Sequence, residues 1–318
     1  MSINHSSIIQ NKDLPLVSIV ICTFNGERFL REQLDSLLAQ TYPLLEFIVS
    51  DDQSTDRTRV ILEEYAENDK RFRLFFHEKN KGLNKNFEQA IQLANGAYIS
   101  ICDQDDYWAP EKISEMMKAW RPGSNFMFCL SGKMDERGPE FRRPAPPVYY
   151  SDIDQLHTLV FNTPVNGHAC IIRKEFAVSC MPFPANIYYD WWMSMFAASE
   201  GVIVCLPQTL CWQRLHGKNV SHQIHNLKDQ EEKNNRKRNE WVYFIREFLA
   251  IGKGEEKLRR SLEEYAHILN QMDGKKFNWK MFRYVMKHRR LIFHYKRKPL
   301  VIISHIKHAL KMAKTGVL

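Results

Sequence analysis

Residues 45–52, LEFIVSDD, and residues 97–106, AYISICDQDD, are apolar runs that each end in clustered carboxylates. Both runs have the length and the branched or aromatic side chains of buried strands, so each predicts a strand that stops at its acids. Open α/β sheets bind ligands beyond the carboxyl ends of their parallel strands. Carboxylates clustered there repel one another unless a cation or hydrogen-bond donors compensate them. The two stretches therefore predict an α/β sheet that binds a metal ion and a nucleotide.

The first hundred residues alternate strand and helix patterns in the order βαβαβαβ. Two further strands are expected at Val17–Cys22 and Phe72–Phe76. Apolar residues with helical spacing follow each of the first three strands. Right-handed crossovers between these strands would give a parallel sheet with helices on both faces. The helical positions are Leu30, Leu34, Leu37 and Leu38, then Val60, Ile61, Leu62 and Tyr65, then Phe87, Ala90, Ile91 and Ala94.

Four loops leave the expected strands at one rim of this sheet. Ordinary helix capping explains Ser54, Thr55 and Asp56 well, but it does not explain the paired acids. The chain has no G-x-G-x-x-G after the first strand and no G-x-x-x-x-G-K-[ST] segment, which disfavours dinucleotide and P-loop chemistry. The loops are Thr23 to Glu27, Asp51 to Ser54, His77 to Gly82 and Asp103 to Asp106.

Three segments resemble the N-terminal motifs of family 2 inverting glycosyltransferases: residues 17–26 (VSIVICTFNG), 49–56 (VSDDQSTD) and 102–108 (CDQDDYW). The resemblance spans roughly residues 15–222 and implies a GT-A fold, which binds nucleotide sugars on a mostly parallel twisted sheet. It implies that the first two loops hold the base and ribose of the donor, and that the D-x-D acids address the ribose and a divalent cation. The nucleotide-sugar-binding residues expected from it are Thr23, Asn25, Glu27, Asp52, Asn80 and Asp103, with Asp105 as metal ligand.

A sugar nucleotide leaves as a diphosphate, so its growing negative charge must be stabilised as the bond to the anomeric carbon breaks. Mg²⁺ or Mn²⁺ suits this task, because such hard cations prefer oxygen ligands and keep waters and phosphate oxygens beside one or two carboxylates. A single D-x-D segment is therefore enough protein ligation.

A base must also remove the proton of the attacking acceptor hydroxyl. Asp190 is the candidate, because the aromatic residues of the segment 187–192, IYYDWW, could exclude water and raise its basicity. The resemblance agrees, since bacterial rhamnosyltransferase-like members carry an Asp followed by aromatic residues at this point. The alternative is that Asp190 caps a helix at 191–199, and the two roles are compatible.

The segment 213–219, QRLHGKN, resembles the Arg-x-His-Gly segment of the same subgroup. Arg214 could close over the diphosphate, and a neutral His216 could ligate the metal. His168 in the turn 163–169 is as plausible a structural neighbour as a contact. The Gln-x-x-Arg-Trp motif of processive synthases is absent, so we expect transfer of one sugar per encounter.

The C-terminal segment is strongly basic. Residues 274–318 contain thirteen Lys and Arg and no acid, whereas the whole chain is only +8, so the remainder is net acidic. Aromatic and aliphatic residues alternate with these cations, which is typical of a segment lying on anionic lipid. The alternatives are a packed helical appendage with a solvated basic face and, less favoured, nucleic-acid binding.

From these observations we expect a polar tail at 1–13, a GT-A domain at 14–222 and a helical basic region at 223–318. We expect inverting, metal-dependent transfer of a single sugar from dTDP-rhamnose or a UDP-sugar to a hydroxyl of a lipid-linked glycan acceptor, in bacterial surface polysaccharide biosynthesis. A nucleotidyltransferase and a non-catalytic GT-A-like module are the alternatives. The polar N-terminus without an apolar leader and seven cysteines without a C-x-x-C pair favour a cytoplasmic protein, peripheral on the inner face of the membrane.

Overall fold

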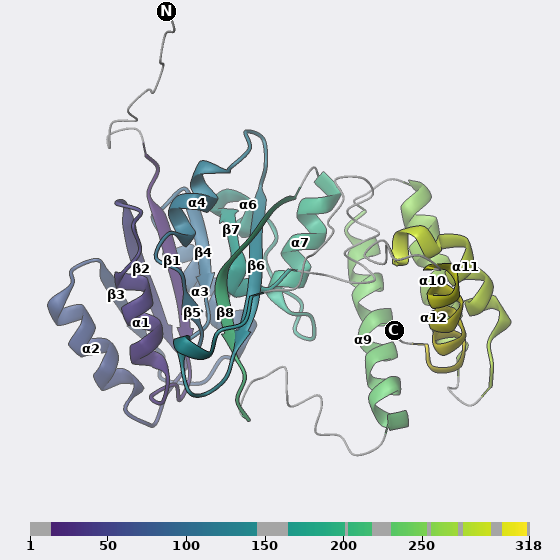
Figure 1. Ribbon diagram of the computed structural model, residues 1–318, viewed down its shortest axis with the longest axis horizontal. Coiled ribbons are helices and arrows are strands. Elements are labelled where there is room, and N and C mark those ends of the chain that lie inside the picture. Colours follow the sequence, from purple (N-terminus) through teal and green to yellow (C-terminus); the bar gives the residue numbers. More distant parts are fainter. Residues whose placement is uncertain are drawn as a thin grey trace, which may run out of the picture.

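The computed structural model describes residues 14–144, 165–200, 203–217, 230–252, 256–272, 276–293 and 301–316. An eight-stranded sheet carries helices on both faces, and further helices pack at one end (Figure 1). The strands are β1 (Val17–Thr23), β2 (Leu45–Asp51), β3 (Phe72–Phe76), β4 (Tyr98–Cys102), β5 (Tyr107–Trp108), β6 (Phe126–Met134), β7 (Cys170–Arg173) and β8 (Val204–Arg214). The α-helices are α1 (Leu30–Leu38), α2 (Thr58–Asn68), α3 (Leu83–Leu93), α4 (Lys112–Lys118), α6 (Lys174–Ser179), α7 (Tyr189–Glu200), α9 (Gln230–Ala250), α10 (Glu256–Asn270), α11 (Trp279–Ile292) and α12 (Val301–Thr315).

The sheet has the strand order β3-β2-β1-β4-β7-β6-β8-β5. The four strands expected from the first hundred residues are parallel to one another, as predicted. The other half is mixed, because β7 runs antiparallel to both β4 and β6. The reversal of strand order beside β1 places the loops after β1, β2 and β4 at one edge, which is where ligands bind in such sheets.

Two hydrophobic clusters cover the two faces of the sheet. Side chains alternate across a strand, so Val17, Ile19 and Ile21 of β1 join one cluster with α1, α2 and α4. Val20 and Cys22 join the other, which includes α3, α6 and α7. The continuous apolar strand pattern of the sequence follows from this burial on both faces.

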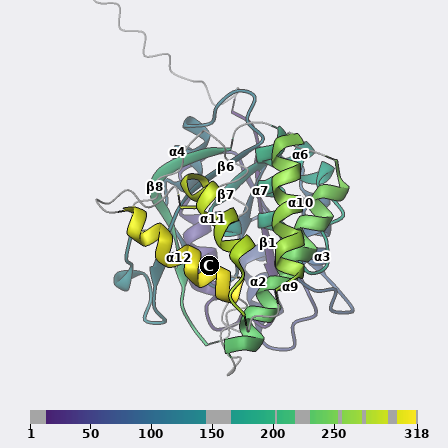
Figure 2. The same cartoon turned by 90° about the vertical axis from the view of Figure 1, so that its right-hand side faces the viewer.

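The C-terminal helices belong to the second of these clusters. Phe244 of α9, Tyr265 of α10, Tyr284 of α11 and Met312 of α12 are all buried within it. The predicted helical region is therefore packed against the sheet domain, and Figure 2 looks onto this end of the molecule, with α12 toward the viewer. Among the described residues, no helix has the length and apolar character needed to cross a membrane.

Some sequence predictions fall outside the described residues. These are the tail at 1–13, the boundary at 222, the turn residues 163 and 164, residues 218 and 219 of the segment 213–219, and residues 274, 275, 294–300, 317 and 318 of the basic segment. In the segment 121–150 the sequence pattern predicts only one strand, at 126–130. The structure describes this segment up to residue 144, and β6 continues four residues beyond Leu130. All seven cysteines are free thiols, and six of them are buried.

Candidate active site

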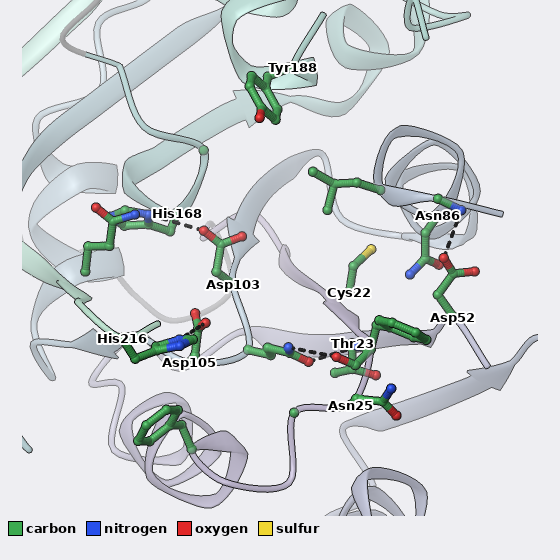
Figure 3. Close-up of a pocket in the computed structure, with 18 of the residues that line it drawn as sticks. Cys22, Thr23, Asn25, Asp52, Asn86, Asp103, Asp105, His168, Tyr188 and His216 are labelled. Atoms are coloured by element: carbon green, nitrogen blue, oxygen red, sulfur yellow. Dashed lines mark hydrogen bonds and ion pairs between the residues drawn. The ribbon is translucent and has the colours of Figure 1, made fainter. Parts of the chain in front are cut away.

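A cleft of about 1460 Å³ opens at the carboxyl ends of β1, β2 and β4 (Figure 3). Its walls also include the start of α7 and the loop that follows β8. The structure brings nine of the ten residues predicted for the site to this one cleft. They are Thr23, Asn25, Glu27, Asp52, Asn80, Asp103, Asp105, Asp190 and His216.

The loop after β1 is held rigidly at its base. Asn25 adopts a φ of 49°, a conformation that Asn tolerates better than most residues, and its Oδ1 accepts from the Thr55 backbone N–H at 2.8 Å. The carboxylate of Glu27 accepts from the Arg57 N–H at 2.9 Å. These hydrogen bonds attach the loop to the start of α2. The loop is therefore already ordered, and binding a ligand to its polar groups would cost little further conformational entropy.

Gln104, the middle residue of D-x-D, fastens the same loop from the other side. Its Oε1 accepts from the Phe24 N–H at 2.9 Å, and its Nε2 donates to the Phe24 carbonyl at 3.1 Å. A Cβ on Gly26 would lie 2.3 Å from the Gln104 Oε1, so glycine is needed for this approach. Sequence reasoning missed Gln104, although its place between two assigned acids was a usable signal.

The two acids that end β2 have different surroundings. Asp51 is fully buried and bonded to Thr23, Ser54 and Arg59, so its carboxylate supports the fold. Asp52 faces the cleft, and its carboxylate accepts from the backbone N–H groups of Lys81 at 2.7 Å and Gly82 at 2.9 Å. This carboxylate therefore orders the start of α3 at the wall of the cleft.

Asn80 lies in the loop between β3 and α3 and is tied to Asp52. Its Nδ2 donates to the Asp52 carbonyl at 3.1 Å, and its Oδ1 accepts from the Gly82 N–H at 3.2 Å. The side chain therefore organises the cleft wall that it lines.

The two predicted metal ligands lie together. The Oδ2 of Asp105 is 2.8 Å from the Nε2 of His216, and both side chains line the cleft with 18% and 8% exposure, respectively. A carboxylate oxygen and a neutral imidazole nitrogen form a donor set that Mn²⁺ or Mg²⁺ accepts alongside phosphate oxygens. The residues present thus fit the expected cation.

A second group of candidate ligands lies beside the first. The Nδ1 of His168 is 3.4 Å from Asp103 Oδ2 and 3.1 Å from Asp106 Oδ2, and its Nε2 is 2.7 Å from the Ser131 hydroxyl. The three potential ligand atoms lie within 4.8 Å of one another. The sequence left the role of His168 open and did not assign Asp106, although Asp106 belongs to the same acidic run.

Burial and charge both act on this second group. Burial raises the pKa of Asp106 to about 7. The neighbouring His168 lowers this pKa, whereas the Asp105 and Asp103 carboxylates raise it further. Burial alone would lower the pKa of His168, but the facing Asp106 and Asp103 carboxylates outweigh it, so this pKa lies above its usual value. The Asp106 carboxyl and the His168 imidazole therefore both hold a proton more readily than usual.

Arg214 is the predicted site residue that does not line the cleft. The end of β8 lies beneath the acidic loop, so the side chain is buried and turned to that loop's backbone. Its Nε donates to the Asp105 carbonyl at 2.9 Å, and its backbone N–H donates to the Asp106 carboxylate at 3.0 Å. The guanidinium also pairs with Glu32 and lies 4.5 Å from the Phe29 ring centroid. In this structure the side chain supports the acidic loop, and its expected contact with a diphosphate stays a prediction.

Asp190 lies at the start of α7 and lines the cleft. Its carboxylate accepts from the Trp191 N–H at 2.7 Å and from the Gly167 N–H at 2.9 Å, so it caps the helix. Burial nevertheless raises the pKa of Asp190 to about 6, and the Asp103 carboxylate adds to this rise. The two hydrogen bonds from backbone N–H groups oppose it. Capping and elevated basicity coexist at this side chain, as the sequence analysis allowed.

Comparison with known proteins decides the family. The family model described as "Glycosyl transferase family 2" matches residues 18–180, about half of the chain. The chain belongs to glycosyl transferase family 2. The acidic cleft at the carboxyl ends of the parallel strands agrees with this membership.

The curated proteins similar to this chain include bacterial ones. An uncharacterized protein of Mycobacterium bovis is 30% identical over 213 residues, covering 65% of this chain and 60% of the relative. The match thus spans under two thirds of that relative's length. A putative teichuronic acid biosynthesis glycosyltransferase of Bacillus subtilis is 34% identical over 104 residues, covering 33% of this chain and 41% of the relative.

Solved structures show the same GT-A fold. TarS of S. aureus, residues 1–349 in complex with UDP-GlcNAc, superposes with a TM-score of 0.60 at 17% identity. The superposition covers 95% of this chain and 92% of that 1–349 chain. A mannosyltransferase of Pyrobaculum calidifontis in complex with GDP-Man and Mn²⁺ superposes with a TM-score of 0.58 at 17% identity. The superposition covers 96% of this chain and 83% of the mannosyltransferase chain. At this identity the likeness concerns the fold.

Proposed function

We propose that this glycosyltransferase transfers one sugar from a nucleotide-diphosphate sugar to a hydroxyl of a glycan, with inversion at the anomeric carbon and with a divalent cation bound. The observation that carries the proposal is the location of Asp190 in the same cleft as the Asp105–His216 pair. A base and a cation site on one cleft are the two groups that a single displacement of a diphosphate requires.

Asp190 supplies the proton acceptor. With a pKa of about 6 the carboxylate is ionised at neutral pH and still more basic than an ordinary Asp. It takes the proton from the acceptor hydroxyl as the oxygen attacks the anomeric carbon. Attack from the face opposite the leaving diphosphate gives the inverted product.

Asp105 and His216 would hold Mg²⁺ or Mn²⁺ in this proposal, and the cation would offset the charge of the leaving diphosphate. The mannosyltransferase of similar fold carries Mn²⁺ with its GDP-Man, which supports a cation of this kind. Arg214 fixes the backbone of the acidic loop from beneath, so that Asp105 keeps its direction toward the cleft.

The donor is proposed to be dTDP-rhamnose or a UDP-sugar. Thr23, Asn25, Glu27, Asp52 and Asn80 would hold its base and ribose, with Asp103 at the ribose. Support comes from their common location in the cleft and from the UDP-GlcNAc that TarS binds in a similar fold.

The acceptor is proposed to be a glycan, including a lipid-linked one, in bacterial surface polysaccharide synthesis. The Bacillus subtilis relative named for teichuronic acid biosynthesis supports this class of pathway. An anionic membrane surface is the proposed partner of residues 274–318, which would place the enzyme on the inner face of the membrane.

Helix α12 supports this membrane proposal. One face is buried through Ala309, Met312 and Ala313. The opposite face, here called the α12 ridge, exposes four aliphatic side chains beside three lysines, a composition that suits the interface of an anionic bilayer. The ridge consists of Ile302, Ile303, Ile306, Lys307, Leu310, Lys311 and Lys314.

Product analysis tests the proposed reaction. The enzyme is incubated with dTDP-rhamnose, UDP-glucose, UDP-GlcNAc or UDP-galactose, with Mn²⁺ or with EDTA, and released nucleotides are separated by chromatography. Glycosyl transfer, or slow hydrolysis of the donor by water, releases the nucleoside diphosphate only with the cation present. Release of nucleoside monophosphate in its place would indicate nucleotidyl chemistry, and no cleavage of any donor in this panel would contradict the proposed donor range.

A further inference from the structure

An exposed aromatic ring stands next to Asp190 at the cleft. Tyr188 is 42% exposed, whereas the neighbouring Tyr189 is only 4% exposed. Tyr188 lines the cleft, and Figure 3 shows its ring at the edge of the cleft with the hydroxyl turned inward. Its position in the figure is well separated from Thr23, Asn25 and Asp52, where the donor base and ribose are proposed to bind.

The segment that carries Tyr188 is fixed from below. The Nδ2 of Asn84 donates to the carbonyls of Pro184 at 2.8 Å and Ile187 at 2.7 Å. The ring of Tyr189 packs on Phe87 of α3 with centroids 4.3 Å apart. Tyr188 is therefore an exposed ring on a braced backbone, which loses little conformational entropy when it binds a ligand.

Trp191 extends this aromatic surface on the other side of Asp190. Its ring stacks on Phe244 of α9 at 3.8 Å with an interplanar angle of 7°, and Trp241 meets it edge-on at 4.8 Å. Another part of Trp191 lines the cleft. Helix α9 thus fixes the orientation of the Trp191 ring, and Trp191 is one of the residues that line the cleft.

Polar groups border the aromatic surface. Arg236 and Glu240 of α9 form an ion pair at 2.9 Å. Burial raises the pKa of Tyr188, and the carboxylates of Glu240 and Asp190 reinforce the shift while Arg236 opposes it. The Tyr188 hydroxyl stays protonated at neutral pH and can both donate and accept a hydrogen bond.

We propose that Tyr188 and Trp191 form the acceptor subsite, which binds the sugar ring of the acceptor glycan by stacking and presents one of its hydroxyls to Asp190. A pyranose has an apolar face of C–H groups and a rim of hydroxyls. It therefore matches aromatic rings that are bordered by charged and hydroxyl groups. The proposal rests on the proposed function, since it names the part of the cleft that receives the second substrate of that reaction.

The test compares Tyr188→Ala and Tyr188→Phe with the unchanged full-length enzyme. Para-nitrophenyl glycosides of glucose, galactose, N-acetylglucosamine and rhamnose serve as acceptors, and the accepted donor is varied separately. Tyr188→Ala is expected to raise the acceptor KM by about tenfold, the scale of one aromatic contact, with the donor KM within about twofold. Tyr188→Phe should keep most of the affinity, because stacking needs the ring rather than the hydroxyl.

Phe76→Ala is the matched control, because Phe76 is an exposed aromatic residue at the end of β3 that does not line the cleft. It should change neither KM, and a thermal-shift measurement confirms that all three variants are folded. An unchanged acceptor KM in Tyr188→Ala, or a rise confined to the donor KM, overturns the proposal. So does a wild-type enzyme that cleaves its donor but neither uses nor binds any glycoside in the panel. A wild-type enzyme that cleaves no donor instead contradicts the proposed function.

Discussion

The Asp190 carboxylate accepts hydrogen bonds from two backbone N–H groups and also has a raised pKa. Two amide N–H groups stabilise its ionised form, but burial outweighs them and moves its pKa to about 6. A base must be deprotonated to act, so activity is retained above this pKa and lost below it. Protonation of Asp190 should therefore contribute to the acid limb of the pH profile.

The Asp190→Asn variant tests the base directly. Turnover should fall by about 10²-fold or more, the usual scale for a lost general base, while donor KM stays within about twofold. The wild-type kcat/KM should fall about tenfold per pH unit below about pH 6. The variant should lose this limb. Glu63→Gln, which neutralises an exposed acid on α2, is the control. Wild-type turnover in Asp190→Asn would leave this carboxylate with only its capping role.

The Asp105→Ala variant tests the cation site. Binding of a nucleoside diphosphate should depend on Mn²⁺ in the wild type and lose this dependence in the variant, because Asp105 would help to hold the cation that offsets the charge of the diphosphate. Thermal shift with and without Mn²⁺ measures the effect, since a ligand of the folded state raises stability by mass action. Glu115→Ala on α4 serves as control. If Asp105→Ala kept the Mn²⁺ response and His168→Gln lost it, the cation would belong to the Asp103–Asp106–His168 group.

The direction of single side chains was the least predictable part of the site. The acids could be placed from sequence, because strand ends bring them to one edge whatever the details of packing. The direction of the Arg214 side chain could not be predicted, because it is set by partners far away in sequence. These partners are Glu32, the Phe29 ring and the Asp105 carbonyl. Tyr188 and Tyr189 are adjacent and identical in type, and only the packing of the second on Phe87 separates their roles.

At the scale of elements, the strands of the parallel half of the sheet could be predicted from the sequence, whereas in the mixed half the first part of β6 was predicted but β5 was not. Each strand of the parallel half is an apolar run followed by a turn and a helical pattern. By contrast, β5 has two residues, and its pairing of Tyr107 with Trp212 of β8 is antiparallel across a hundred residues of chain. Such a short element has no periodicity of its own to detect.

The Phe244→Ala variant tests how α9 supports the cleft. Phe244 is fully buried between Trp191 and the C-terminal helices, so the substitution removes a stacked ring and leaves a cavity. The free energy of unfolding should fall by about 3 kcal/mol or more in urea denaturation. Arg246→Ala, on the exposed face of the same helix, should change it by less than about 0.5 kcal/mol. A Phe244→Ala value as small as that of the control would contradict the packing described.

At the scale of the whole molecule, the α12 ridge should bind anionic vesicles. Each lysine near such a surface is worth about 1 kcal/mol, so the triple variant Lys307→Gln, Lys311→Gln and Lys314→Gln should weaken co-sedimentation on the order of 10²-fold. Salt should release the wild type. Three exposed lysines elsewhere, Lys70, Lys118 and Lys257, changed to Gln give a variant of equal net charge. Equal binding by both variants would show that the ridge is not the contact.

The buried cluster shared by α7 and the helices from α9 to α12 makes the basic region part of the folding unit. Thermal unfolding of the two regions is then a single cooperative event, with the calorimetric enthalpy equal to the van't Hoff enthalpy. Removing the last two helices would expose one side of the layer that supports the base. The C-terminal segment is thus unlike a detachable anchor, and transplanting it to another enzyme would transfer its charge without its structure.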